Sequence, residues 1–211
     1  MISLNCLFQK ISPGLISLKR TKIYASRKTR LDDSDPFKKF VLAEINLHWA
    51  LTRAKFDQLF KAGREVYAAY SLLESNQDQF PEFIHNKKSL SIIHTLIETI
   101  RIPGFIKKLL GMEGSIHLGI EEIQDVLQFA KAESYFFENE AEAIYTYILF
   151  YQANQKKSAF EFIKQSNLNH RKSLLANFLK VKIAQRSGNN DIALRWLSER
   201  PIQKVYAEFH Y

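Results

Sequence analysis

Apolar side chains recur every three or four residues along most of the chain after residue 33. This period indicates amphipathic helices. The clearest case is the segment 172–200, in which one apolar stripe ends before Gly188 and a second begins at Ile192. A glycine directly after a stripe is typical of a helix C-terminus, and two helices joined by so short a turn must lie antiparallel. This segment is therefore a predicted helical hairpin.

The same spacing predicts helices over most of the remaining sequence. Strand-like alternation is almost absent, and the chain has only seven glycines and five prolines, so an all-α fold is predicted. Ser34 or Asp35 is expected to cap the first helix, with Pro36 at its first position. The expected helices cover residues 34–54, 58–77, 86–100, 105–110, 115–132, 136–153 and 154–165, followed by the hairpin. Their buried stripes are expected to include Leu51, Phe60, Tyr67, Tyr145, Tyr151 and Leu175.

Small residues near the start of the second helices point to a repeat. Ala62, Gly119, Ala159 and Ala193 are separated by 57, 40 and 34 residues, and the last interval fits a helical hairpin repeat. With Gly188 in the turn and Pro201 after the last helix, the sequence resembles tetratricopeptide repeats. Segments 49–73, 80–100, 107–123 and 188–201 are similar to an uncharacterised group of bacterial tetratricopeptide-repeat proteins. Residues 108–123 show a weaker similarity to eukaryotic inclusion-body-clearance repeat proteins.

This resemblance implies a fold and a domain organisation. It implies antiparallel helical hairpins stacked as a right-handed solenoid like that of tetratricopeptide repeats, over residues 34–211. Residues 1–33 are then a basic N-terminal arm or the remnant of a preceding repeat. An N-terminally incomplete copy is the alternative, since members of that group begin with further helices. The resemblance brings no catalytic residues.

The net charge of +8 is unevenly distributed. Residues 1–33 contain seven Lys/Arg and two Asp, so five of the eight excess positive charges lie in this segment. The rest of the chain carries no basic stripe of the kind found in nucleic-acid-binding proteins. A nucleic-acid partner is therefore not expected for this part of the chain. The segment has no apolar run long enough to span a bilayer and lacks the order of features of a secretory signal. A transit peptide is a weaker alternative.

Motifs of known chemistry are missing from the sequence. The six histidines never fall in HExxH spacing, Cys6 is the single cysteine, and no phosphate-loop, dinucleotide-binding or nucleophile-elbow motif occurs. We therefore expect no catalytic, cofactor-binding or metal-binding residues and no enzyme activity. The carboxylates Glu138, Glu140 and Glu142 are expected on a solvated helix face, with a basic peptide as the alternative partner.

These observations favour a non-catalytic protein-binding scaffold or adaptor, in which the inner groove of the superhelix holds a protein or peptide. Residues on first helices but off the apolar stripe are the candidate partner-binding residues: Asn46, Arg53, Asn177 and Lys180. The alternative function is attachment to an anionic surface, nucleic acid or membrane, through the basic arm. We expect a soluble, intracellular protein, with export of a longer parent protein left open. Partner identity, compartment and oligomeric state stay open.

Overall fold

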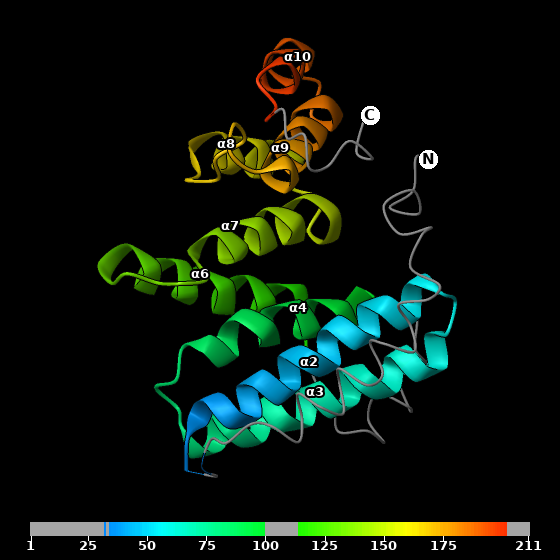
Figure 1. The fold of residues 1–211 in the computed structure, drawn as a ribbon, viewed down its shortest axis with the longest axis vertical. Coiled ribbons are helices and arrows are strands. Elements are labelled where there is room, and N and C mark those ends of the chain that lie inside the picture. Colours follow the sequence, from blue (N-terminus) through cyan, green and yellow to red (C-terminus); the bar gives the residue numbers. More distant parts are fainter. Residues whose placement is uncertain (1–31, 33, 100–113, 202–211) are drawn as a thin grey trace. The chain divides into compact units, whose positions relative to one another are not determined.

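A computed structural model of the chain describes residue 32 and residues 34–99 and 114–201, and in these ranges every regular element is helical (Figure 1). The predicted all-α class is confirmed for this part of the chain. The elements are α2 (Pro36–Lys55), α3 (Leu59–Gln79), α4 (His85–Thr99), α6 (Ile116–Ala132), α7 (Glu138–Tyr147), the π-helix η2 (Ile148–Gln152), α8 (Lys156–Gln165), α9 (Leu174–Arg186) and α10 (Asn190–Ser198). The predicted helix 105–110 and the tail after residue 201 lie outside the described residues.

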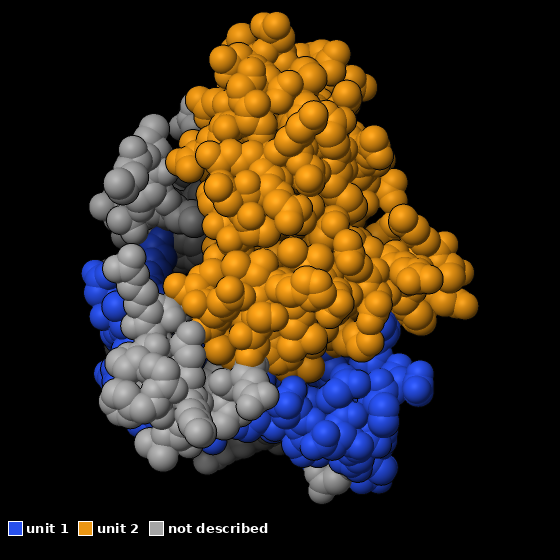
Figure 2. All heavy atoms as spheres, turned by 180° about the vertical axis from the view of Figure 1, so that it is seen from behind, with its two compact units in different colours: residues 1–86, 208–211 blue, residues 87–207 orange. Residues whose placement is uncertain are grey.

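The chain divides into two compact units, coloured separately in Figure 2. Unit 1 comprises residues 1–86 and 208–211, and unit 2 comprises residues 87–207. The predicted boundary between residues 33 and 34 lies at the edge of the described residues and stays a prediction. Among the described helices, none combines the length and the apolar composition that a bilayer-spanning segment requires.

The described part of unit 1 is dominated by the α2–α3 hairpin, whose helices pack against each other along their length. Helix α2 begins as predicted: Pro36 is at its start, and the backbone N–H of Phe37 donates to the side chain of Asp35 at 2.8 Å. Asp57 takes the left-handed conformation, with φ of 56°, in the turn to α3. The predicted antiparallel neighbours are therefore present in unit 1.

One end of the hairpin is closed by an amide and a cluster of rings. The Nδ2 of Asn76 donates to the carbonyl of Pro36 and to the Oδ1 of Asn86, each at 2.9 Å. The rings of Phe37, Phe40, Phe83 and His85 contact one another, with centroids 4.7 to 6.4 Å apart. Buried amide bonds and edge-to-face rings both favour one packing arrangement, so this end of the hairpin is well defined.

Several residues predicted on buried stripes are exposed instead. Leu51 and Phe60 belong to the opposite end of the same hairpin, Tyr67 lies farther along α3, and Leu175 lies in the first turn of α9. Their prediction as core residues is wrong. In the α2–α3 hairpin each helix buries only the stripe that faces the other helix, and Leu51, Phe60 and Tyr67 lie outside these stripes.

In unit 2 each helix packs on the next one along the chain, from α6 through α7 and α8 to α9 and α10. The core is formed by buried residues of η2, α8, α9 and α10, including Leu149, Phe150, Phe160, Ile163, Ile183 and Trp196. Gly188 ends α9 with φ of 81°, as its position in the sequence predicts. The hairpin of residues 172–200 is therefore confirmed as two adjacent antiparallel helices.

Gly119 allows α6 to approach α4 closely. A Cβ atom at this position would lie 2.2 Å from the Oγ1 of Thr95 and 2.5 Å from the carbonyl oxygen of Ser91. Helix α6 starts at its predicted cap, because the N–H of Leu118 donates to the Oγ of Ser115 at 3.0 Å. The four small residues aligned in the sequence as a repeat, Ala62, Gly119, Ala159 and Ala193, are all buried.

Candidate functional site

Arg53, one of the predicted partner-binding residues, is engaged inside the α2–α3 hairpin. Its Nε donates to the Oε1 of Glu65 at 3.2 Å, and its Nη1 donates to the Oε1 of Gln58 at 3.0 Å. The guanidinium also lies 5.2 Å from the ring centroid of Trp49, within the range of a cation–π contact. Asn46, the other candidate on α2, is half-buried. Arg53 thus joins the end of α2 to the start of α3.

Asn177 and Lys180, the two candidates on α9, are buried. Their expected position outside the apolar face is wrong. The physical reason is that α9 packs on both α8 and α10, and a helix with two neighbours buries more of its circumference than its apolar stripe covers. Their predicted role in partner binding stays a prediction, and any partner contact would require access to buried atoms.

The two residues belong to a buried group that we call the α9 polar cluster: Glu142, Asn177, Lys180 and Trp196. The Nδ2 of Asn177 donates to the backbone carbonyl of Trp196 at 2.7 Å. The ammonium of Lys180 lies 5.5 Å from the centre of the Trp196 ring. Glu142 accepts a hydrogen bond from the backbone N–H of Asn167 at 3.0 Å and is itself buried. The expectation that Glu142 lies on a solvated face is therefore wrong.

Burial dominates the electrostatics of this cluster. It raises the pKa of Glu142, while the N–H of Asn167 and the charge of Lys180 act in the opposite direction. Burial also lowers the pKa of Lys180, and the charge of Glu142 opposes that shift. Burial away from water disfavours the ionised form of an acidic or basic group, and a nearby opposite charge partly offsets this effect. Hydrogen bonds therefore link α7 to the segment before α9, and α9 to α10.

An exposed aromatic surface, which the sequence reasoning missed, lies where α7 passes into η2. The sequence predicted one helix over residues 136–153, but the N–H of Ala153 donates to the carbonyl of Ile148 at 2.9 Å. This bond spans five residues and admits an extra residue into the turn. Tyr151 is exposed, and its ring lies beside that of Tyr147, four residues earlier, with centroids 5.1 Å apart. Its prediction as a core residue is wrong.

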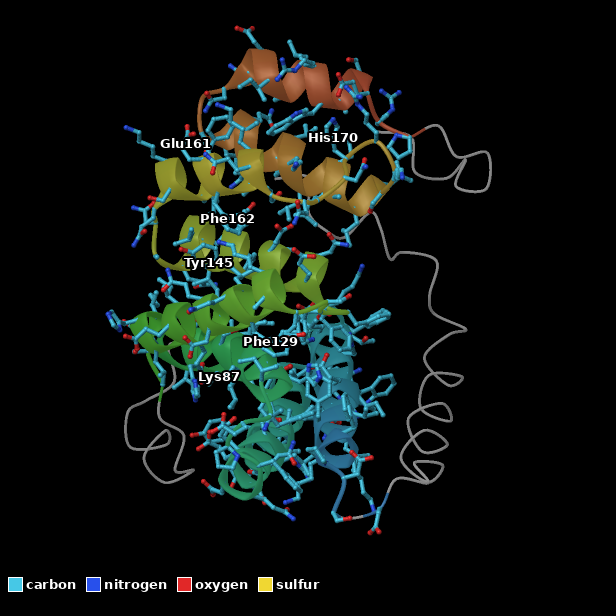
Figure 3. The ribbon with its side chains drawn as sticks, turned by 90° about the vertical axis from the view of Figure 1, so that its left-hand side faces the viewer. Lys87, Phe129, Tyr145, Glu161, Phe162 and His170 are labelled. Carbon is cyan, nitrogen blue, oxygen red and sulfur yellow. The ribbon has the colours of Figure 1, made fainter. Side chains whose placement is uncertain are left out.

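Tyr147 and Tyr151, which we call the tyrosine pair, are each 42% exposed. The Nε2 of Gln152 donates to the hydroxyl of Tyr147 at 3.3 Å, which orients that ring. Tyr145 differs from them: it is half-buried, its ring lies 4.7 Å from that of Phe162 on α8, and its hydroxyl accepts a bond from Gln124 (Figure 3). Tyr145 thus joins neighbouring helices, whereas the tyrosine pair presents its rings to solvent.

Histidine–carboxylate pairs occur at three places in the described part of unit 2, and one of them, His117 with Glu121 at 3.4 Å, is exposed on the surface of α6. His94 Nδ1 lies 2.7 Å from Glu122, and His170 Nε2 lies 2.7 Å from Glu199. Arg171 also binds Glu199, and the hydrogen bonds from Arg171 and His170 lower the pKa of Glu199 to about 2. In the described ranges no group of three or more histidine, cysteine, aspartate or glutamate side chains is arranged to hold a metal ion.

Comparisons with known proteins identify no relative. No protein-family model matches the chain, and neither the curated proteins nor the solved structures contain a match. The described part of the chain is all-helical and packed as hairpins, and no family is identified for the chain.

Proposed function

We propose that this chain is a non-catalytic scaffold that binds another polypeptide through side chains exposed on its helical hairpins. The observation that carries the proposal is the tyrosine pair at the junction of α7 and η2. Tyrosine is enriched among the residues that contribute most to protein interfaces, because it offers a large rigid surface together with a hydroxyl. Short π-helical turns are often found at functional sites. At such a turn in unit 2, Tyr147 and Tyr151 lie side by side and are each 42% exposed.

The finer form of the proposal is a right-handed solenoid, like that of tetratricopeptide repeats, with a partner in its inner groove. The adjacent antiparallel helices and the four buried small residues support it. The residues predicted to bind the partner in this form are Asn46, Arg53, Asn177 and Lys180, of which Asn177 and Lys180 are buried. Asn46 is the most suitable of the four for a direct test, because it is half-buried and its replacement would break no buried hydrogen bond to another described residue.

The test is affinity capture of partners by the full tagged chain from a lysate of its host, at low and at high salt. The dissociation constant of each captured protein is then measured with purified components. We expect the double variant Tyr147→Ala/Tyr151→Ala to weaken binding about tenfold or more, the range of interface hot spots. Phe136→Ala is the matched control, because Phe136 is a 90% exposed aromatic residue elsewhere in unit 2. Equal affinity of the tyrosine variant and the wild type would contradict the proposal.

Attachment of the basic arm to an anionic surface stays the alternative. Its residues lie outside the described ranges, so the support for it is the charge distribution of the sequence. Counterion release makes such binding fall steeply as salt rises. Capture of nucleic acid or lipid alone, lost at high salt, would favour the arm over the tyrosine pair.

A further inference from the structure

The turn between α2 and α3 carries a group of solvent-exposed apolar side chains, at the cyan end of the hairpin in Figure 1. We call this group the hairpin tip: Phe56 in the turn, Leu59 and Phe60 at the start of α3, and Leu51 in α2, about one helical turn before its end. Leu51 is 70% exposed, Leu59 is 68% exposed and Phe60 is 83% exposed, while Phe56 is 37% exposed. Scattered single apolar residues are ordinary on a protein surface, but a cluster of them at one end of a hairpin marks an interaction site.

Positively charged side chains follow the apolar residues along α3. Lys61 and Arg64 are exposed, and neither forms an ion pair with any described residue. Between residues 51 and 67 there are four Lys/Arg and two Asp/Glu, an excess of two positive charges. One of the two carboxylates, Glu65, is already bound to Arg53. Asp57, in the turn, is the other carboxylate, and its negative charge offsets part of the positive charge of this segment.

The order of side chains along α3 matches the layers of a membrane interface. Each residue advances an α-helix by about 1.5 Å, so Arg64 lies about 6 Å behind Phe60 along the axis. Interfacial anchors bury their apolar part by a similar depth, about 5–10 Å, below the headgroups. Tyr67 follows Arg64 and is 39% exposed, and tyrosine rings favour the headgroup level. Along α3, starting from the turn, the side chains are therefore first apolar, then cationic and then amphipathic.

We propose that the hairpin tip docks onto the surface of a bilayer that contains anionic phospholipid. Leu59 and Phe60 would enter the region between headgroups and acyl chains, while Lys61 and Arg64 contact the phosphates. Lys61 and Arg64 favour an anionic bilayer over an apolar protein groove. In such a groove these cations would lose their hydration without gaining a negative partner. The attachment is peripheral and independent of both the tyrosine pair and residues 1–33.

The test places a fluorescent reporter at the tip of the full chain. Cys6 is the single cysteine, so Cys6→Ser followed by Phe60→Cys provides one labelling site for an environment-sensitive dye. The matched control is Phe136→Cys in the same background. We expect a blue shift of the dye at position 60 with vesicles of mixed phosphatidylcholine and phosphatidylserine, little shift with phosphatidylcholine alone, and none at position 136.

Sedimentation with the same vesicles tests the chemistry of the tip in unlabelled protein. Leu59→Ser/Phe60→Ser is expected to lower the partition coefficient about tenfold or more, because it removes the inserted apolar surface. Lys61→Glu/Arg64→Glu should abolish the preference for anionic vesicles, and Phe136→Ser should change nothing. Circular dichroism checks that each variant keeps the helical content of the wild type.

Three results would overturn the proposal. The first is an unshifted dye at position 60 on vesicles that nevertheless bind the protein, which would assign binding to another segment such as the basic arm. The second is equal binding to neutral and anionic vesicles. The third is a shift produced by membrane-free protein extract and not by vesicles, which would make the hairpin tip a protein-binding surface.

Discussion

The hairpin tip in unit 1 and helix α9 in unit 2 reverse the usual relation between side-chain chemistry and burial. At the tip, leucine and phenylalanine face solvent, whereas α9 buries an asparagine and a lysine. The tip belongs to a turn between two helices, while α9 packs on a helix at either side. The number of packing neighbours of a segment, as well as its composition, therefore decides which side chains lose contact with water.

The largest expected effect contrasts two phenylalanines of the same hairpin. Phe40 is buried in the ring cluster and Phe60 is exposed at the tip. Phe40→Ala should lower the free energy of unfolding by about 3–5 kcal/mol, because a buried ring leaves a cavity. Phe60→Ala should change it by less than about 0.5 kcal/mol. Urea denaturation followed by circular dichroism measures both, and similar losses would show that the tip is covered in solution.

A second contrast uses one glycine from each unit. Gly119→Ala should destabilise unit 2 by about 2–3 kcal/mol or more, because its methyl group would overlap Thr95 and a backbone carbonyl of α4. At Gly63, within α3, an added Cβ atom would meet no heavy atom of another described element within 4 Å, so Gly63→Ala should stabilise by about 0.5–1 kcal/mol. Denaturation midpoints of the two variants should therefore move in opposite directions. A tolerated Gly119→Ala would contradict the close approach of α6 to α4.

The third contrast compares two asparagines that the sequence placed in the same role. Asn177→Ala should cost about 2 kcal/mol, because it leaves the buried carbonyl of Trp196 without its donor. Asn46→Ala should cost less than about 0.5 kcal/mol, as expected for a half-buried side chain away from such bonds. Equal losses of unfolding free energy would remove the distinction between the α9 polar cluster and the surface of α2.

The smallest expected effect concerns Glu199, which binds His170 and Arg171 beside the α9–α10 hairpin. Its pKa is lowered from 4.5 to about 2 in the folded state. A lowered carboxylate pKa means that this group stabilises the fold above pH 4.5 and that the stabilisation is lost as the pH falls towards 2. Glu199→Gln should slightly lower the thermal midpoint at neutral pH and flatten its fall in this acid range. Parallel acid curves for variant and wild type would contradict the assignment.

Much of the local structure could be predicted from the sequence. Asp35 and Pro36 mark the start of α2, Ser115 caps α6, and Gly188 ends α9. Each signal acts within a few residues, through a side chain that satisfies free backbone groups or a residue that tolerates left-handed φ. Local signals of this kind are present in one sequence, and together with apolar spacing they account for the eight α-helices in the described ranges.

The candidate sites were less predictable. Of the residues proposed to bind a partner, Arg53 forms an ion pair within its own hairpin, and Lys180 lies over Trp196 in the core of unit 2. Their spacing places them off an apolar stripe, but that spacing contains no information about a second packing helix. The five-residue hydrogen bond at Ile148 leaves no signal in the apolar pattern either, and Tyr151, beside Tyr147, is exposed although it keeps helical spacing.

By itself, then, the sequence determined where helices begin and end and that helices joined by a short turn, such as α2 with α3 and α9 with α10, pair, because capping, turn geometry and apolar spacing are local properties. The tertiary structure decided which faces are buried, since burial depends on neighbours supplied by distant parts of the chain. Phe60 is exposed because the described part of unit 1 supplies no third helix over the turn, and Asn177 is buried because α10 supplies both cover and a hydrogen-bond acceptor.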